Sequence, residues 1–283
     1  MSPTRTFHLA GILGYPVAQS RSPLIHNHWI VEHGLNGRYV FLPVQPEPSQ
    51  TLKDAIAGMR AMGFAGGNLT MPHKETVIPL LDHIDPAAKA IGAVNTLAFD
   101  THGALTGYNT DGYGFIHSVL DAQPNWRANA GPIVVLGAGG AARSIVYALV
   151  QQGALNIRIL NRTLDRAQAL ASSLEGAIEV LPWAQRHEAM SDCATLINTT
   201  SLGMYGHEPL DLNLKYLPST ALVADAIYVP LETPLLAAAK AKGSVTVNGL
   251  GMLLNQARPA FNAWFGIMPR ISPALLKAVH ASF

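Results

Sequence analysis

The sequence predicts an α/β protein of two domains, an N-terminal α/β domain followed by a domain built on a doubly wound parallel sheet. Three observations support this prediction. The chain has 283 residues, which suits two domains of ordinary size. Apolar runs of strand length alternate with segments of helical periodicity. Near the middle of the chain, an apolar run leads into a glycine-rich turn that opens a helix.

The first part of the chain contains strand and helix patterns in alternation. Strand patterns occupy residues 8–14, 38–44, 64–70 and 94–99. Helical patterns occupy residues 23–33, 50–62 and 74–80. Because this alternation is typical of βαβ units, we expect a parallel sheet here.

A second series begins after a break in the pattern. A helix is expected from Asp111 to about Leu120, and turn-forming residues at 123–132 follow it. Strands are expected at residues 133–136, 157–160, 195–198, 222–225 and 245–247, with a helix at 140–151. Two further helices are expected at residues 250–265 and 273–280, since apolar residues recur at three- to four-residue steps from Leu250 to Phe261.

The composition excludes several classes of protein. Hydrophobic residues make up 49% of the chain and charged residues 13%, so a sizeable core is easy to build. The formal charge of +1 indicates neither a nucleic-acid partner nor an anionic membrane. Residues 1–7 lack the apolar core of a signal peptide, and no run reaches the ~20 apolar residues of a membrane span. We therefore expect a cytoplasmic protein.

Metal and disulfide chemistry are not expected. Cys193 is the one cysteine, so no internal disulfide can form, and its apolar surroundings in the sequence predict a buried, inert thiol. The 11 histidines are scattered and show no metal-binding spacing. We predict no metal site.

The glycine-rich turn predicts a dinucleotide site. Gly137, Gly139 and Ala142 fit the G-x-G-x-x-G/A fingerprint between a strand and a helix. Gly137 permits the tight turn, Gly139 lets a pyrophosphate approach the backbone, and Ala142 allows close packing of the helix. The phosphates would bind the N–H groups at the start of the helix. The alternative is a plain turn in a sheet protein.

The end of the next strand favours NADP over NAD. An NAD site usually has a carboxylate there, about 20 residues after the glycine turn, to hold the ribose hydroxyls. This chain has Asn161, Arg162 and Thr163, with Arg166 one turn further on, and Asp165 lies in the helix between the arginines. A guanidinium pairs well with a 2′-phosphate. The alternative is a solvated helix start with ordinary surface arginines.

Lys74 is the strongest candidate for proton transfer. Thr70 and Pro72 resemble the start of a helix, which puts Lys74 in its first turn. A cation there faces the positive end of the helix dipole, at a cost of roughly 0.3–1 kcal/mol. The same field makes the ammonium a better proton donor. The alternative is a surface lysine without a catalytic role.

Two other helix starts are ambiguous. Ser22 and Pro23 fit the N-cap and first position of an ordinary helix, but Ser20 adds a second hydroxyl that suits a carboxylate pocket. Thr110 or Asp111 could cap the following helix, or the Asp111 carboxylate could keep the Lys74 ammonium charged.

Taken in order, these motifs resemble the shikimate dehydrogenase family over nearly the whole chain. The matching segments are residues 20–23, 68–74, 92–96, 109–112, 137–141, 161–163, 228–230, 233–235 and 249–252, with Gln256. The resemblance implies the NADP-dependent, reversible reduction of 3-dehydroshikimate to shikimate in aromatic amino-acid (chorismate) biosynthesis.

The resemblance also implies a role for each matching residue. Lys74 would be the main acid/base group, with Asp111 beside it. The implied substrate-binding residues are Ser20, Ser22, Asn68, Thr70, Asn95, Tyr228 and Gln256. The implied cofactor-binding residues are Gly137, Ala138, Gly139, Gly140, Ala141, Asn161, Arg162, Thr163, Arg166, Gly249 and Met252.

The implied architecture is a substrate domain and a cofactor domain with a cleft between them. Residues 1–111 would form the substrate domain, completed by helices at 248–283, and residues 112–247 the Rossmann-like NADP domain. The protein would be a monomer or a homodimer. Two positions depart from the family, namely Asn248 and Tyr108, where aspartate is common in some members. Both are expected to bear on substrate contacts rather than on the chemistry.

Two other functions fit less well. A quinate/shikimate dehydrogenase with broader cofactor use is disfavoured by the intact serine pair and by Arg162 with Arg166. A non-catalytic NADP-sensing protein is expected to lack Lys74 or Asp111, and both are present.

Overall fold

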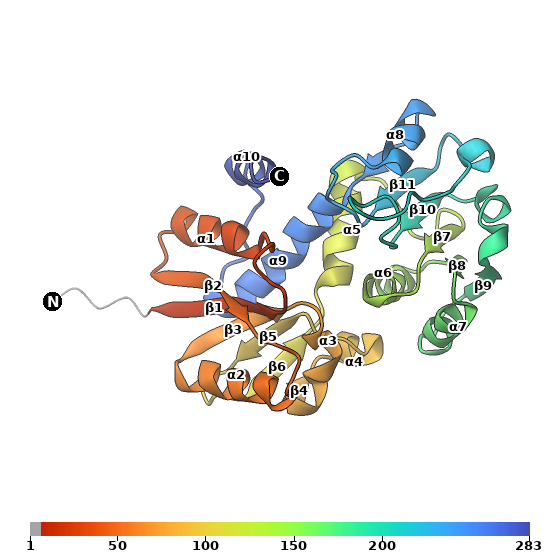
Figure 1. Ribbon diagram of the computed structural model, residues 1–283. Helices are drawn as coiled ribbons and strands as arrows, with labels where there is room; N and C mark the ends of the chain where they lie inside the picture. The colour runs from red at the N-terminus through yellow and green to blue at the C-terminus, as the bar shows by residue number, and fades with distance from the viewer. Residues whose placement is uncertain (1–6) are drawn as a thin grey trace. The chain divides into compact units, whose positions relative to one another are not determined.

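The computed structural model describes residues 7–283, and the chain divides into two compact units (Figure 1). The N-terminal unit comprises the chain up to Thr110 together with Gln256–Phe283, and the central unit comprises Asp111–Asn255. The predicted boundaries, after residues 111 and 247, differ from these by one residue and by eight. Apart from Phe7, the segment tested for a signal peptide lies outside the described residues.

The N-terminal unit contains a mixed six-stranded sheet in the order β2-β1-β3-β5-β6-β4. Its strands are β1 (His8–Gly14), β2 (Gly37–Pro43), β3 (Phe64–Leu69), β4 (His83–Ile84), β5 (Thr96–Phe99) and β6 (Leu105–Tyr108). The β2–β1, β1–β3 and β6–β4 pairs are parallel, whereas β3–β5 and β5–β6 are antiparallel. The prediction of a purely parallel sheet was wrong here, because residues 100–104 connect β5 to β6 as a hairpin, which cannot join parallel strands.

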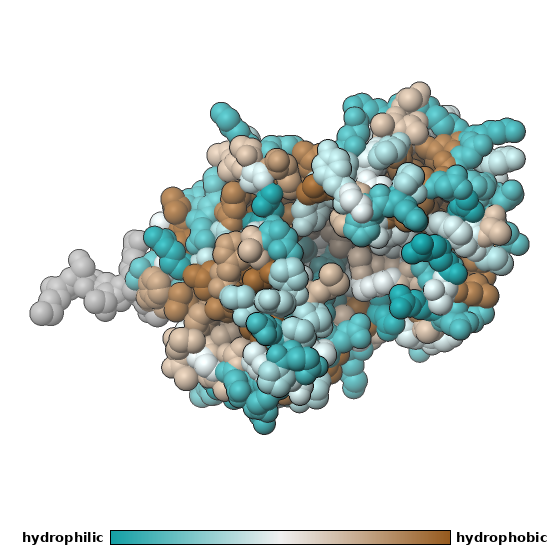
Figure 2. Space-filling view, in the orientation of Figure 1, coloured by the Kyte–Doolittle hydropathy of each residue, from teal (hydrophilic) through white to brown (hydrophobic). Residues whose placement is uncertain are grey.

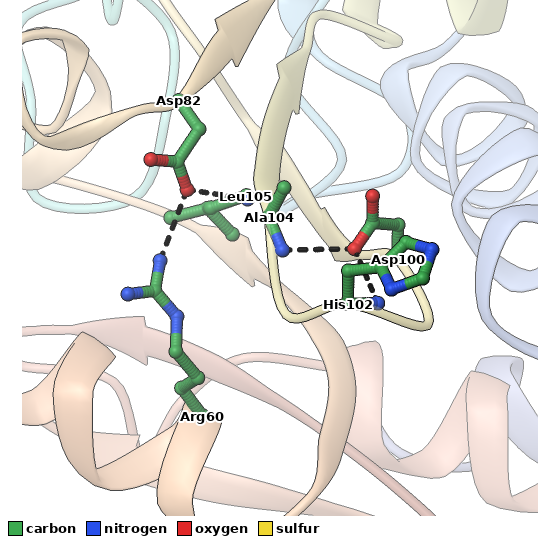
Figure 3. A network of polar contacts seen from close by, with 6 residues as sticks. All are labelled: Arg60, Asp82, Asp100, His102, Ala104 and Leu105. Carbon is green, nitrogen blue, oxygen red and sulfur yellow. Dashed lines mark hydrogen bonds and ion pairs between the residues drawn. The ribbon is translucent and has the colours of Figure 1, made fainter.

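Two aspartates, Asp82 and Asp100, stabilise the β5–β6 hairpin, as Figure 3 shows. Asp100 Oδ1 accepts hydrogen bonds from the backbone N–H groups of His102 and Ala104, each at 2.8 Å. These bonds lower the pKa of the Asp100 carboxyl. Asp82 Oδ2 accepts from the Leu105 N–H at 2.7 Å and from Arg60 at 3.0 Å. The closed turn fixes the register of the strands that lead to Asn95 and Thr110.

Helices cover both faces of this sheet. They are α1 (Ser22–Glu32), α2 (Gln50–Ala61), α3 (His73–Thr76), α4 (Pro86–Ile91), α10 (Pro273–His280) and the second half of α9 (Gly249–Phe265). Figure 1 shows α1 and α10 on one side of the sheet and α2 on the other. A single helix was predicted at residues 74–80, but the structure has α3 followed by a 3-10 turn at Ile78–Leu80. Pro79 explains the break, since it lacks an N–H and its ring crowds the carbonyl four residues earlier.

The central unit contains an all-parallel six-stranded sheet in the order β12-β11-β10-β7-β8-β9. Its strands are β7 (Ile133–Leu136), β8 (Ile157–Asn161), β9 (Ile178–Pro182), β10 (Thr195–Asn198), β11 (Leu222–Asp225) and β12 (Thr246–Val247). This is the strand order of a doubly wound dinucleotide-binding sheet, and the order reverses between β7 and β10. The predicted fold class is confirmed.

Alternate side chains of each central strand pack on opposite faces. Ile133 and Val135 of β7 face the helices α5 (Asp111–Ala122), α6 (Gly140–Gln151) and α7 (Leu164–Ser172). Val134 and Leu136 pack on the other face, with α8 (Pro234–Ala241) and Cys193. Cys193 is buried, as predicted, and burial raises the pKa of its thiol to about 12.

On the face seen in Figure 2, small hydrophobic areas are interspersed with hydrophilic residues. Among residues 7–283, no helix is long and apolar enough to cross a membrane. Within the same residues, no group of three or more metal-ligating side chains comes together. The predicted cytoplasmic location stays a prediction.

Candidate active site

Lys74 lies in the four-residue helix α3 and is half-buried. The helix begins after Pro72, as predicted, but its short length limits the dipole field that it can build. Its backbone is held on both sides of Lys74. The buried His73 donates from Nε2 to the Val44 carbonyl at 2.7 Å, and the Val94 N–H donates to the Lys74 carbonyl at 2.8 Å.

Asn95, the residue after Val94, holds the backbone at Thr110. Asn95 is 3% exposed, and its Oδ1 accepts a hydrogen bond from the Thr110 N–H at 2.9 Å. Thr110 directly precedes Asp111, which opens α5 and is the first residue of the central unit. Two adjacent residues therefore fix the backbone of Lys74 and the backbone that leads into Asp111. The pairing of these two side chains stays a prediction.

A buried network of polar side chains connects three of the predicted substrate ligands. Asn68 Nδ2 donates to the Asn95 carbonyl and to Thr96 Oγ1, each at 3.1 Å. The Thr110 hydroxyl donates to Gln256 Oε1 at 3.4 Å. Through these contacts the structure brings together Asn68, Asn95 and Gln256, all at most 9% exposed.

Sequence reasoning missed the residues that complete this network. Tyr39 donates from its hydroxyl to Asn68 Oδ1 at 2.7 Å, and the Thr96 hydroxyl donates to Asn95 Oδ1 at 2.9 Å. Tyr39 and Thr96 are ordinary strand residues by composition, so the sequence offers no local signal for them.

The two predicted carboxylate ligands lie at the start of α1. Ser20 Oγ and Ser22 Oγ are 3.2 Å apart, and Ser20 Oγ also accepts from the Ser22 N–H. Ser22 was expected at the N-cap, but it is the first helical residue and Arg21 stands at the N-cap without a side-chain cap. The bond from the Ser22 N–H to Ser20 Oγ satisfies one of the N–H groups at the start of the helix. Thr70 lies at the end of β3, where its N–H donates to the Leu13 carbonyl.

Ser22 adjoins the buried network. Burial raises the pKa of the Tyr39 phenol well above its usual value, while hydrogen bonding with the Ser22 hydroxyl acts in the opposite direction. The serine pair and the Asn68 network thus belong to one continuous polar region of the N-terminal unit.

In the central unit, the glycine turn has the shape that a dinucleotide pyrophosphate requires. Gly137 has φ +109°, and a Cβ there would lie 2.5 Å from Thr199 Oγ1. Gly139 is the N-cap of α6, and a Cβ on Gly139 or Gly140 would meet no protein atom within 4 Å. Backbone N–H groups at the start of this 12-residue helix are thus open to an anion. Ala138 and Ala141 lie half-buried in the same turn.

The residues predicted to choose between NADP and NAD follow β8. Asn161 ends the strand, and its Nδ2 donates to the Thr163 carbonyl at 2.8 Å. Thr163 is the N-cap of α7, and both Arg162 and Arg166 are exposed. No carboxylate stands at the end of β8. Two exposed arginines at the start of α7 are the residue type that suits a 2′-phosphate.

A buried carboxylate that sequence reasoning missed organises the loops beyond β10 and β11. Asp225, 2% exposed, accepts hydrogen bonds from Asn198 Nδ2 at 3.0 Å, the Ile227 N–H at 3.1 Å and the Thr233 hydroxyl at 2.7 Å. Burial raises the pKa of the Asp225 carboxyl. These bonds shape the loop that contains Tyr228.

Gly249 packs directly against that loop. Its N–H donates to the Ile227 carbonyl at 2.9 Å, and a Cβ on Gly249 would clash with the Ala226 carbonyl. Asn248, one of the two departures, accepts from the Leu250 N–H at 3.2 Å, so it caps α9. Met252 is half-buried one turn into the helix.

Comparison with known proteins gives matches over both units. A family described as the shikimate dehydrogenase substrate binding domain matches residues 12–97, and one described as shikimate/quinate 5-dehydrogenase matches residues 122–205. The NADP(+) shikimate dehydrogenase of Paramagnetospirillum magneticum is 51% identical over 94% of this chain and 96% of that protein.

Solved structures agree with this similarity. The quinate dehydrogenase of Corynebacterium glutamicum, in complex with NAD, has a TM-score of 0.91 and 30% identity, covering 98% of this chain and 100% of that one. The shikimate 5-dehydrogenase of Thermus thermophilus, in complex with NADP(H) and shikimate, has a TM-score of 0.85 and 35% identity, with coverage of 98% and 100%.

Proposed function

The chain belongs to the shikimate dehydrogenase family, and we propose that Lys74 and Asp111 are the acid/base pair of its reaction. The protein is an NADP-dependent oxidoreductase of the shikimate pathway, which interconverts 3-dehydroshikimate and shikimate. The observation that carries the acid/base proposal is the pair of backbone contacts from Val94 and Asn95. Val94 binds the Lys74 carbonyl, and Asn95 binds the N–H of Thr110, next to Asp111.

The proposed proton transfer follows from the charges of these groups. When the ketone is reduced, negative charge develops on its oxygen, and the Lys74 ammonium donates a proton to that oxygen. In the reverse direction the Lys74 amine takes the proton from the substrate hydroxyl. The Asp111 carboxylate favours the charged ammonium and so keeps Lys74 in the donor state during reduction.

The substrate would be held by the polar region of the N-terminal unit. Ser20 and Ser22 offer two hydroxyls for the carboxylate. Asn68, Thr70, Asn95 and Gln256 would contact the ring hydroxyls. Because the network is buried and its members bond to one another, their orientations are set before substrate arrives, which lowers the entropy cost of binding.

The cofactor would be held by the central unit. The backbone from Gly137 to Ala141 fits the pyrophosphate, because Gly139 and Gly140 leave open space where other residues would carry a Cβ. Asn161, Arg162, Thr163 and Arg166 would hold the 2′-phosphate side, with Tyr228, Gly249 and Met252 towards the nicotinamide. When bound, NADP supplies the acceptor and donor of hydride.

One assay tests the function and its nearest alternative. The absorbance of reduced cofactor is followed with shikimate or quinate, each with NADP or NAD. We expect the highest kcat/KM with shikimate and NADP. The alternative is a quinate/shikimate dehydrogenase with broader cofactor use, and the similarity to an NAD-bound quinate dehydrogenase is the observation in its favour. Comparable turnover of quinate with NAD would establish that alternative.

The role of Lys74 is tested by Lys74→Ala. We expect turnover to fall by about 10²–10⁴-fold with a smaller change in shikimate KM, since a proton donor acts mainly in the transition state. Lys89→Ala, which removes an exposed lysine from α4, is the matched control and should keep wild-type kinetics. Near-wild-type turnover of Lys74→Ala would remove this residue from the mechanism. The predicted cleft and the choice between monomer and homodimer stay predictions.

A further inference from the structure

Two residues of α1 that follow the serine pair have no role in the proposed chemistry. His26 and Asn27 follow Ser22 by one turn of α1, and both contact the same residue of β2, Tyr39. The contacts are of different kinds, and together they hold both the backbone and the side chain of Tyr39.

Asn27 holds the backbone of Tyr39. Its Nδ2 donates to the Tyr39 carbonyl at 2.8 Å, and its Oδ1 accepts from the Tyr39 N–H at 3.0 Å. The same Nδ2 donates to the Pro23 carbonyl at 2.8 Å, so the amide is anchored to α1 as well. Both polar atoms of the side chain are therefore used to tie β2 to α1 at this one residue.

His26 holds the ring of Tyr39. The two rings are stacked, with centroids 4.3 Å apart and an interplanar angle of 18°. His26 is fully buried, and Trp29, Phe261 and Trp264 surround it at centroid distances of 5.2–6.0 Å. Neither ring nitrogen of His26 makes a hydrogen bond of normal geometry among the described residues, and the effect of the nearby Asn68 side chain on the His26 pKa is smaller than that of burial. His26 therefore acts on Tyr39 through its ring face, as a neutral aromatic side chain.

Tyr39 in turn determines the orientation of Asn68. The backbone carbonyl of Asn95 can only accept a hydrogen bond, so the side-chain atom of Asn68 that faces it must be Nδ2. Oδ1 then faces the Tyr39 hydroxyl at 2.7 Å, and Tyr39 must be the donor. The second Nδ2 hydrogen is directed to Thr96 Oγ1. An amide oxygen has two acceptor positions, and Tyr39 uses one of those on Asn68 Oδ1.

We propose that Tyr39, held by His26 and Asn27, is a positioning residue that fixes the Asn68 amide so that Oδ1 accepts from a substrate hydroxyl. This inference rests on the proposed function, in which Asn68 binds the ring of the substrate. It gives His26 and Asn27 of α1 a role in supporting Asn68, a substrate-binding residue of β3 that lies 41 or 42 residues further along the chain.

The test is Tyr39→Phe, which removes the hydroxyl and keeps the stacked ring. We expect the KM for shikimate to rise about 3–10-fold, the range of one hydrogen bond, while the KM for NADP stays at the wild-type value. Tyr205→Phe makes the same chemical change at an exposed residue and should be silent. Equal increases in both KM values would indicate a general structural defect and would overturn the proposal.

A double-mutant cycle with Asn68→Ala sharpens the test. If Tyr39 acts through Asn68, the effect of Tyr39→Phe on shikimate KM should fall below about twofold in the Asn68→Ala background. An undiminished effect there would show that Tyr39 acts by another route.

A readout that does not need turnover separates this inference from the proposed function. The Asn68 side-chain amide signals, assigned by their loss in Asn68→Ala, should be protected from solvent exchange in the wild type and shifted in Tyr39→Phe. Absence of turnover in the wild type refutes the proposed function alone. Unchanged Asn68 amide signals in Tyr39→Phe refute the positioning role, whether or not the enzyme is active.

Discussion

The two units prepare their ligand sites in opposite ways. The N-terminal unit uses buried side chains that bond to one another, such as Asn68 and Asn95, each at most 4% exposed. The central unit uses bare backbone, since Gly139 and Gly140 leave open space around the start of α6. A ring acid with several hydroxyls must be told apart from similar acids, which needs fixed donors and acceptors. A pyrophosphate needs only close N–H groups, which side chains would obstruct.

This difference predicts two kinds of sensitivity. In the buried network, removal of a single atom leaves a partner unsatisfied, and burial makes that costly. At the glycine turn, the addition of a single atom is harmful, because it occupies the space of the ligand. The following predictions test this contrast, in order of expected effect.

The largest effect is expected at His26, whose pKa burial lowers from 6.5 to about 3. Between these two pH values the unfolded chain binds a proton that the folded chain does not, so stability falls as pH falls. The shift corresponds to up to roughly 5 kcal/mol at pH 3. His26→Phe should lose this dependence, as measured by urea unfolding from pH 3 to pH 8.

The control for His26 is the exposed His280 of α10. His280→Phe should follow the wild-type pH dependence of the free energy of unfolding. If the free energy of unfolding falls in parallel for His26→Phe and the wild type as the pH is lowered, then the aromatic residues around His26 do not exclude its charged form.

The next effect is expected from Gly139→Ala. The added Cβ meets no protein atom within 4 Å, so the melting temperature should stay within about 2 °C of the wild type. The NADP KM should rise at least about tenfold, because the methyl group enters the space of the pyrophosphate. Steady-state kinetics and thermal unfolding measure the two parts.

Gly66 gives the matching experiment in the N-terminal unit. A Cβ there would clash with the Leu97 carbonyl and with Trp264 Nε1, so Gly66→Ala should lower the melting temperature instead. Wild-type NADP kinetics in Gly139→Ala would contradict the role of this glycine in binding the cofactor.

The smallest effect is expected from Arg162→Ala, because the guanidinium is exposed and water weakens its contacts. The NADP KM should rise about 3–10-fold, and the NAD KM should not change. Measurement of both constants in the wild type is part of the test. Equal preference for NAD and NADP in the wild type would refute the role given to Arg162.

The sequence predicted every strand of the central sheet except β9, whereas in the N-terminal sheet it missed β4, β6 and the antiparallel pairings. The strand Ile133–Leu136 is a continuous apolar run, because both faces of a parallel sheet are covered. The two-residue strand His83–Ile84 is too short to leave a pattern. β5 pairs antiparallel with β6 because the hairpin closed by Asp100 reverses the direction of the chain. The alternation of strand and helix patterns in the sequence does not reveal this reversal.

The candidate ligands were predictable as residue types but not as a network. Lys74 and Asn68 lie in a recognisable motif, whereas Tyr39 is one aromatic residue of a strand. Its partner Asn68 is 29 residues away, and Gln256 bonds to Thr110 across 146 residues. Contacts at such separations follow from the tertiary fold, and local patterns in the sequence contain no information on them.

The course of α9 has a consequence for synthesis on the ribosome. Its first half belongs to the central unit and its second half, from Gln256, to the N-terminal unit. Trp264 in that second half donates to the Leu97 carbonyl at 2.7 Å, and Phe261 is fully buried. The N-terminal unit has one core cluster built from residues between Leu13 and Leu105, but the side chains of Phe261 and Trp264 reach it only when translation is almost finished. The central unit ends at Asn255, so its chain is complete before that of the N-terminal unit, although the N-terminal unit begins first.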